Sequence, residues 1–179
     1  MSEVSRSLHF WKGGHAELRL LAEKQSVVGR FVGANERWAC AVVYGPEDEQ
    51  QLLASAPGIV LVWWYADDYA LNLAFHQAGR RIGELSLAWG SAKASAPLRA
   101  PLLCWLLQEA VLDGSRVEQL LQLAREVDAG TLGGEPVRDR AAAILGLPAH
   151  EWLSPEMCIE VPLEQFREAY ADAEDFAKE

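Results

Sequence analysis

The chain contains none of the short motifs that mark common catalytic and nucleotide-binding sites. Neither a GxxxxGK[ST] phosphate loop nor a GxGxxG fingerprint occurs, and no GxSxG sequence places a serine nucleophile. The glycine-rich stretch at residues 130–134 follows a predicted helix, so it lacks the strand–loop–helix context of a phosphate site. These absences favour a binding protein over an enzyme.

Cysteine and histidine are also scarce, and they are scattered. The three cysteines, Cys40, Cys104 and Cys158, lie far apart without a CxxC pair, and the 4 histidines are isolated from one another. This spacing fits neither a disulfide framework nor a zinc site. We therefore expect three reduced thiols packed in the core, and neither a metal nor a cofactor.

Long apolar runs and basic residues are few. The longest apolar run, residues 59–65, is much shorter than the roughly 20 residues that cross a bilayer. Because residues 1–7 lead into no hydrophobic leader, we expect a cytoplasmic protein without membrane contact. Lys and Arg number 16 against 26 Asp and Glu, and the net charge of -10 disfavours nucleic acid and permits a basic partner.

Hydrophobic residues make up 50% of the 179 positions, which is enough for the core of one domain. Residues 27–89 carry strand patterns, interrupted by a short predicted helix at 47–55. The apolar segment 59–65 is typical of a central strand covered on both faces. A turn at Gly79 gives two strands one shared face. The residues expected on that face are Leu71, Leu73, Phe75, Leu85, Leu87 and Trp89.

From residue 98 the hydrophobic spacing changes to the three-and-four pattern of helices. Helices are predicted at 98–113, 116–128, 136–145 and from 162 onward. Nearer the N-terminus, residues 8–12 fit a short strand and residues 15–24 a helix. The sequence thus predicts a single α+β domain, 1–179. An antiparallel meander of four to five strands (about 27–89) is followed by a helical half (98–179) packed on one face.

Adjacent tryptophans mark one candidate for a partner-binding surface. On a strand, Trp63 and Trp64 must point to opposite faces of the sheet. One of them then fills the core beneath the helices, and the other is either packed or exposed on the opposite face. An exposed tryptophan beside Asp67 and Asp68 is a candidate interface anchor, because tryptophan is enriched at binding hot spots.

Acidic residues near the C-terminus mark a second candidate. In a helix that begins at residue 162, Glu164, Glu168, Asp172 and Asp175 recur at spacings of three and four residues and form one stripe. Like charges at this spacing destabilise a helix, so a stripe of one sign favours a basic partner. A solvated acidic face is the alternative interpretation.

The segment Trp64-Tyr65-Ala66-Asp67-Asp68, followed by a hairpin with Gly79, resembles a class of small bacterial cytoplasmic proteins. The later segment Ile144-Leu145-Gly146-Leu147-Pro148, which precedes Trp152-Leu153-Ser154, extends this resemblance. In size and acidity the chain resembles the immunity proteins of bacterial polymorphic toxin and secretion-effector systems. Where we expect Asp-Gly-Trp-Gly after the acidic pair, this chain has Asp68-Tyr69-Ala70-Leu71, so no site residue carries over.

The absence of catalytic motifs, the acidic balance and the one-sign stripe lead us to expect a non-enzymatic immunity-type protein that neutralises a toxin or effector, expected to be basic, by occluding it. The candidate partner-binding residues are Trp63, Trp64, Asp67, Asp68, Glu164, Glu168, Asp172 and Asp175. Two other classes of function stay open. One is an adaptor or chaperone for a secreted effector, which would use a sheet edge or an apolar groove. The other is a small enzyme whose site assembles only in the folded chain.

Overall fold

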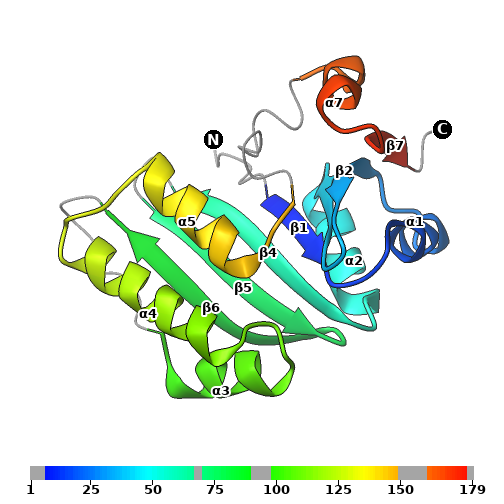
Figure 1. Cartoon of the computed structure of the whole chain (residues 1–179). Helices are drawn as coiled ribbons and strands as arrows, with labels where there is room; N and C mark the ends of the chain where they lie inside the picture. The colour runs from blue at the N-terminus through cyan, green and yellow to red at the C-terminus, as the bar shows by residue number, and fades with distance from the viewer. Residues whose placement is uncertain (1–6, 67–69, 90–97, 149–160, 177–179) are drawn as a thin grey trace.

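The computed structural model describes residues 7–66, 70–89, 98–148 and 161–176 (Figure 1). Its strands are β1 (Ser7–Trp11), β2 (Gly29–Ala34), β3 (Ala39–Val43), β4 (Ile59–Ala66), β5 (Ala70–Gln77), β6 (Arg80–Ala88) and β7 (Glu174–Phe176). Its helices are α1 (His15–Lys24), α2 (Pro46–Ser55), α3 (Ala100–Gln108), α4 (Gly114–Asp128), α5 (Glu135–Leu145) and α7 (Leu163–Ala169). The predicted α+β class is confirmed. Within the described ranges, every helix is too short or too polar to cross a membrane.

The seven described strands form one antiparallel sheet in the order β6-β5-β4-β1-β3-β2-β7. The predicted meander is correct for β4–β6 and for the β2–β3 hairpin, but it is wrong between β3 and β4. There β1 is inserted, so that Phe10 lies opposite Cys40 on one side and Leu61 on the other. The connection through α2 leaves room for this insertion, and each half of the sheet gains a hydrogen-bonded neighbour.

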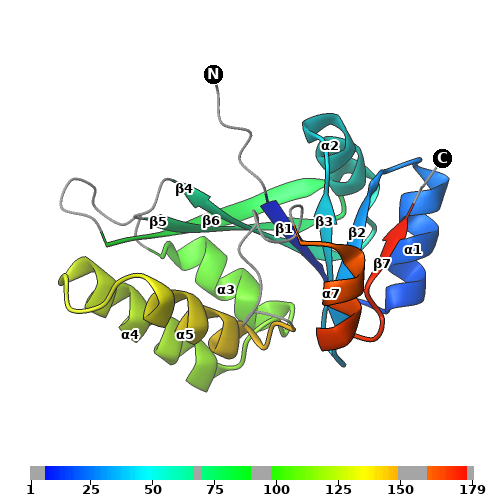
Figure 2. The same ribbon diagram turned by 90° about the horizontal axis from the view of Figure 1, so that it is seen from above.

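Helices cover both faces of the sheet, and each face has its own hydrophobic core (Figure 2). The larger core lies beneath α3, α4 and α5, which confirms packing on one face for this part of the predicted helical half, although Phe176 near its end is buried on the other face. The smaller core lies beneath α1 and α2 on the opposite face. Because side chains alternate along a strand, Trp63 of β4 enters the larger core and Val62 the smaller one. The prediction of a doubly covered central strand is therefore confirmed.

The β5–β6 hairpin has the predicted register. Leu71 lies opposite Leu87 and Leu73 opposite Leu85, all four in the larger core. The turn uses positive φ angles at Ala78 (48°) and Gly79 (79°). A side chain at Gly79 would also come within 2.9 Å of the Ala54 carbonyl oxygen, so glycine is required there for two reasons.

The predicted helix at 98–113 is too long at its C-terminal end. α3 ends at Gln108, and the chain reverses at Ala110, whose φ is 53°. This reversal turns Val111 and Leu112 inward, where both are buried in the larger core. The Arg37 guanidinium donates a hydrogen bond of 2.7 Å to the Val111 carbonyl oxygen and so ties the turn to the β2–β3 connection. A longer helix would have left these two apolar side chains on different faces.

Replacing Phe75 with alanine should lower the free energy of unfolding by about 3–5 kcal/mol. Phe75 is completely buried and packs edge to face on Trp105, with ring centroids 5.8 Å apart. Urea unfolding monitored by circular dichroism measures the change. Leu20→Ala is the control, because Leu20 is 65% exposed and its loss should cost less than about 0.5 kcal/mol. Equal effects of the two substitutions would contradict the packing described.

Candidate functional site

The C-terminal part of the chain does not form the single helix that the sequence predicts. α7 ends at Ala169, the chain turns through residues 170–173, and β7 then pairs with the edge strand β2. Residues 161–176, named the C-terminal strap below, therefore cross the end of the sheet beside β2 (Figure 1). The predicted acidic stripe is accordingly broken: Glu164 and Glu168 lie on α7, Asp172 in the turn and Asp175 on β7.

Apolar side chains anchor the strap to both cores, which explains why the helix stops. Phe166 of α7 and Ala173 of the turn are buried in the larger core. Phe176 of β7 is buried in the smaller core, on the opposite face of the sheet. A continuous helix would present these three residues along one side only. The extended β7 allows the strap to pass the sheet edge and fill both layers.

A largely buried ion pair fastens β7 to β2. The guanidinium of Arg30, a residue only 8% exposed, donates from Nε to Asp175 Oδ1 at 2.9 Å and from Nη1 to the Val161 carbonyl oxygen at 2.6 Å. It also lies over the ring of Phe166, 5.4 Å from the ring centroid. Burial alone lowers the pKa of Arg30, but its hydrogen bonds and electrostatic interactions with Asp175 and Tyr44 together outweigh burial and raise the pKa. Arg30 thus stays positively charged while it joins both ends of the strap to β2.

Glu174 makes a second polar connection, to α1. Its carboxylate lies 2.8 Å from His15 Nε2 and accepts a hydrogen bond of 3.1 Å from Arg19. The His15 ring in turn stacks on Phe31 of β2, with centroids 3.7 Å apart. Two adjacent carboxylates of the predicted acidic region, Glu174 and Asp175, are therefore engaged inside the molecule. Neither is presented to solvent as a free charge.

The other strap carboxylates face solvent. Glu164, Glu168 and Asp172 are exposed, and among the residues that the structure describes none of them has an ion-pair partner. The base between them in sequence, Arg167, donates to the Ala173 carbonyl oxygen at 3.1 Å instead of to a carboxylate. The strap thus presents an acidic face, defined here as the side chains of Glu164, Glu168 and Asp172.

Tyr44, at the end of β3, was not among the sequence candidates although it lies beside the strap. Its side chain is 39% exposed, and its hydroxyl donates to Asp175 Oδ1 at 3.1 Å. Burial and the charge of Asp175 raise the pKa of the Tyr44 hydroxyl against the opposing effect of Arg30. In sequence Tyr44 continues the alternation of Trp38 and Cys40, both of which are buried, and this pattern gives no sign of its exposure.

The structure does not form the predicted tryptophan site as one exposed surface. The two indoles do point to opposite faces, as predicted, but Trp63 is buried and packs edge to face against Phe10 and Tyr65 at centroid distances of 6.3 Å. A partner cannot reach it without opening the core. Trp64 is half-buried against the smaller core. Asp67 and Asp68 lie outside the described residues.

A second polar cluster lies beside α2, on the opposite face of the sheet from α3–α5. The Ser7 hydroxyl donates to Glu49 Oε2 at 2.9 Å, and Nε2 of the buried His9 lies 3.7 Å from Glu49 Oε1. The serine is therefore bonded to a carboxylate and not to an imidazole that could take its proton, as nucleophile activation requires. Burial raises the pKa of Glu49, but its contacts with His9 and Ser7 and the charge of His76 together lower it.

The structure separates the cysteines that the sequence grouped as core thiols. Cys40 is buried in the larger core as expected, but Cys104 is exposed on α3, where the expectation was wrong. Cys158 lies outside the described residues. Within the described part of the chain, no three His, Cys, Asp or Glu side chains converge in a way that could hold a metal ion. Elemental analysis of the purified protein tests the prediction that no metal is bound.

Replacing Arg30 with leucine should lower the free energy of unfolding by about 3–5 kcal/mol, because Asp175 would keep a poorly solvated charge without its partner. Amide hydrogen exchange should also accelerate at Gly29 and Phe31, which lie opposite β7. Arg19→Leu is the control: its ion pair with Glu174 is half exposed and should contribute less than about 1 kcal/mol. Unchanged exchange at Gly29 and Phe31 would show that the ion pair does not hold the strap.

Replacing Glu49 with glutamine should destabilise the protein by about 1 kcal/mol near pH 6 and by much less in acid. Because the pKa of Glu49 lies below its usual value of 4.5, the carboxylate stabilises the folded state above that pH. The contribution is lost as the pH falls through the folded-state pKa. Unfolding curves of parent and variant across this range measure the difference. Glu47→Gln, on an exposed residue of the same helix turn, is the control and should change the free energy of unfolding by less than about 0.5 kcal/mol.

Comparisons with known proteins give no further guide to the site. No protein-family model, no curated protein and no solved structure matches the chain. The resemblance to immunity proteins therefore stays a prediction from sequence, and the function must be argued from the geometry of the strap.

Proposed function

We propose that the protein binds a basic partner protein through the acidic face of the C-terminal strap and acts as an immunity-type protein that neutralises a toxin or effector. One observation carries this proposal. Of the five strap carboxylates, Glu174 and Asp175 are neutralised inside the molecule, whereas Glu164, Glu168 and Asp172 are exposed without an ion-pair partner among the described residues. Two carboxylates of the strap thus form ion pairs within the fold, whereas the other three face solvent.

The anchoring of the strap favours binding. Phe166 and Phe176 hold it to the two cores, and Arg30 holds it to the sheet edge, so the exposed carboxylates occupy defined positions before a partner arrives. A preorganised surface loses less conformational entropy on association than a segment that must fold on binding. The net charge of -10 adds long-range attraction toward a basic protein.

Tyr44 supplies the kind of anchor that the acidic face lacks. Charged rims mainly raise the association rate, whereas partly buried aromatic side chains contribute most of the affinity in protein interfaces. The hydroxyl of Tyr44 is already fixed by Asp175, and part of its ring is open to solvent. A partner that covers both Tyr44 and the acidic face would be held at the edge of the sheet, and its own active surface would be blocked.

The triple substitution Glu164→Gln, Glu168→Gln and Asp172→Asn should slow association with the partner by roughly tenfold at low salt. The effect should diminish as added salt screens the charges, whose reach is about 10 Å at 0.1 M. Stopped-flow mixing with a purified basic toxin domain, where a neighbouring gene encodes one, measures the rate, and growth of cells producing that toxin measures protection.

A matched variant removes three other exposed carboxylates, through Glu36→Gln, Glu118→Gln and Asp128→Asn. It has the same net charge as the strap variant and should retain more of the parental association rate and protection. If both triple variants lose the same amount, only net charge matters and the strap is not the binding face. If neither variant differs from the parent at low salt, the acidic face does not bind the partner and the proposed interface is wrong.

A further inference from the structure

Two exposed apolar side chains lie next to each other at the end of the β2–β3 hairpin. Val28 is 38% and Tyr44 39% exposed, and the Tyr44 amide donates to the Val28 carbonyl oxygen at 3.1 Å, which continues the antiparallel pairing of β2 and β3 by one step. Residues opposite each other in such a pair have their Cβ atoms about 4.5–5.5 Å apart on one face. The two side chains therefore form one surface, named the Val28–Tyr44 patch below.

The patch adjoins the C-terminal strap. Val28 lies two residues before Arg30, so both side chains share the face of the sheet on which the Arg30 guanidinium lies over Phe166 of α7. The Tyr44 hydroxyl donates to Asp175 Oδ1 at 3.1 Å. Because this bond fixes the tip of the ring, the exposed part of the ring has a defined orientation. The patch is thus a preorganised continuation of the strap surface.

The chain around the patch is mostly acidic. The segments 24–30, 44–49 and 161–176 come together at this end of the sheet and contain eight acidic residues against three basic ones. Two of the three bases already donate to groups of the strap. Glu47, in the first turn of α2, is exposed and has no ion-pair partner among the described residues. An apolar patch in acidic surroundings complements a side chain with an apolar stem and a positively charged end.

Arginine fits this description better than lysine. The guanidinium is planar and weakly hydrated and stacks on aromatic rings, whereas the ammonium group of lysine is compact and strongly hydrated. A cation over the face of an aromatic ring is attracted by the negative charge of that face. The chain itself contains such a contact, since Arg30 lies 5.4 Å from the ring centroid of Phe166.

We propose that the Val28–Tyr44 patch binds an arginine side chain of the basic partner, with the guanidinium over the Tyr44 ring and the aliphatic stem on Val28. The identity of the partner rests on the proposed function, whereas the preference for arginine rests on the patch itself. Because charges such as those of the acidic face act mainly on the association rate, the patch should act mainly on the lifetime of the complex.

The first test uses N-acetyl-L-arginine methylamide as the probe and needs no toxin. In an NMR titration at constant ionic strength, the Val28 methyl and Tyr44 ring signals should shift together and give one dissociation constant. N-acetyl-L-citrulline methylamide has a similar shape without the charge and should bind about two- to fivefold more weakly. The corresponding lysine derivative should also bind more weakly than the arginine derivative.

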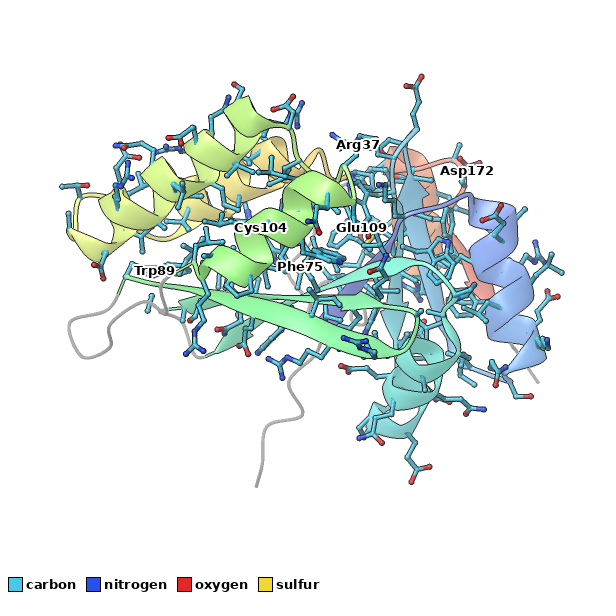
Figure 3. The ribbon with its side chains drawn as sticks, turned by 90° about the horizontal axis from the view of Figure 1, so that it is seen from below. Arg37, Phe75, Trp89, Cys104, Glu109 and Asp172 are labelled. Atoms are coloured by element: carbon cyan, nitrogen blue, oxygen red, sulfur yellow. The ribbon has the colours of Figure 1, made fainter. Side chains whose placement is uncertain are left out.

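Leu20 and Leu107 are the internal controls, because both are exposed leucines on other elements. In Figure 3, α3, which carries Leu107 and the labelled Cys104, is well separated from Asp172 of the strap. The methyl signals of both leucines should stay in place. Tyr44→Phe keeps the ring and should retain arginine binding, whereas Tyr44→Ala should weaken it to the level of citrulline or below. Thermal unfolding verifies that both variants are folded.

The second test measures the complex with a purified basic toxin domain, where a neighbouring gene encodes one. Tyr44→Ala should raise the dissociation rate constant at least about tenfold and change the association rate constant less than about twofold. The triple variant of the acidic face should show the opposite pattern. Stopped-flow association and displacement by excess unlabelled protein measure the two constants.

Three results of the first test would overturn the arginine site. They are unshifted Val28 and Tyr44 signals at the highest soluble probe concentration, equal affinity for the arginine and citrulline derivatives, and equal shifts at Leu20 and Leu107, which would show nonspecific contact. The two proposals fail separately. Arginine binding without toxin binding would contradict only the proposed function. Toxin binding that Tyr44→Ala leaves unchanged would contradict only the arginine site.

Discussion

The buried ion pair between Arg30 and Asp175 is the interaction on which the arrangement of the C-terminal strap depends. An arginine in the middle of an edge strand is costly to bury unless its charge is paired and its remaining donors are used. Here Asp175, the Val161 carbonyl oxygen and the Phe166 ring meet that requirement. The need to neutralise Arg30 therefore brings residues some 130 to 145 positions away in sequence to β2. Pairing with β7 also covers the edge of that strand.

The two edges of the sheet are protected from strand addition in different ways. β7 covers the β2 edge, whereas β6 is the last described strand at the opposite edge. β6 carries exposed charges at Arg80, Arg81 and Glu84, and its register shifts where β5 passes from Phe75 to His76. Charges and irregular pairing are the usual protection of an edge against nonspecific strand addition. This argues against a partner strand at β6 and favours the side-chain surface of the strap.

The strap and the outer side of α3 differ in charge. The acidic face of the strap presents fixed negative charge, which attracts a basic partner over a distance but contributes little apolar contact. The outer side of α3 is uncharged and carries the exposed residues Ala100, Cys104 and Leu107. Their separation follows from the sheet, because the strap crosses one edge and α3 lies near the other.

Local patterns in the sequence were sufficient to predict those helices and strands whose neighbours are close in the chain. Alternation and the Gly79 turn predicted the β5–β6 register, and helical spacing predicted α4 and α5 to within a few residues. They could not predict that β1 enters between β3 and β4, because strand order depends on pairing between distant segments. Nor could spacing show that Asp175 neutralises a buried arginine while Glu164 faces solvent, since the two carboxylates fit the same helical repeat. Only the tertiary structure decided this: Phe166 and Phe176 are buried on opposite faces of the sheet, and a single helix cannot reach both.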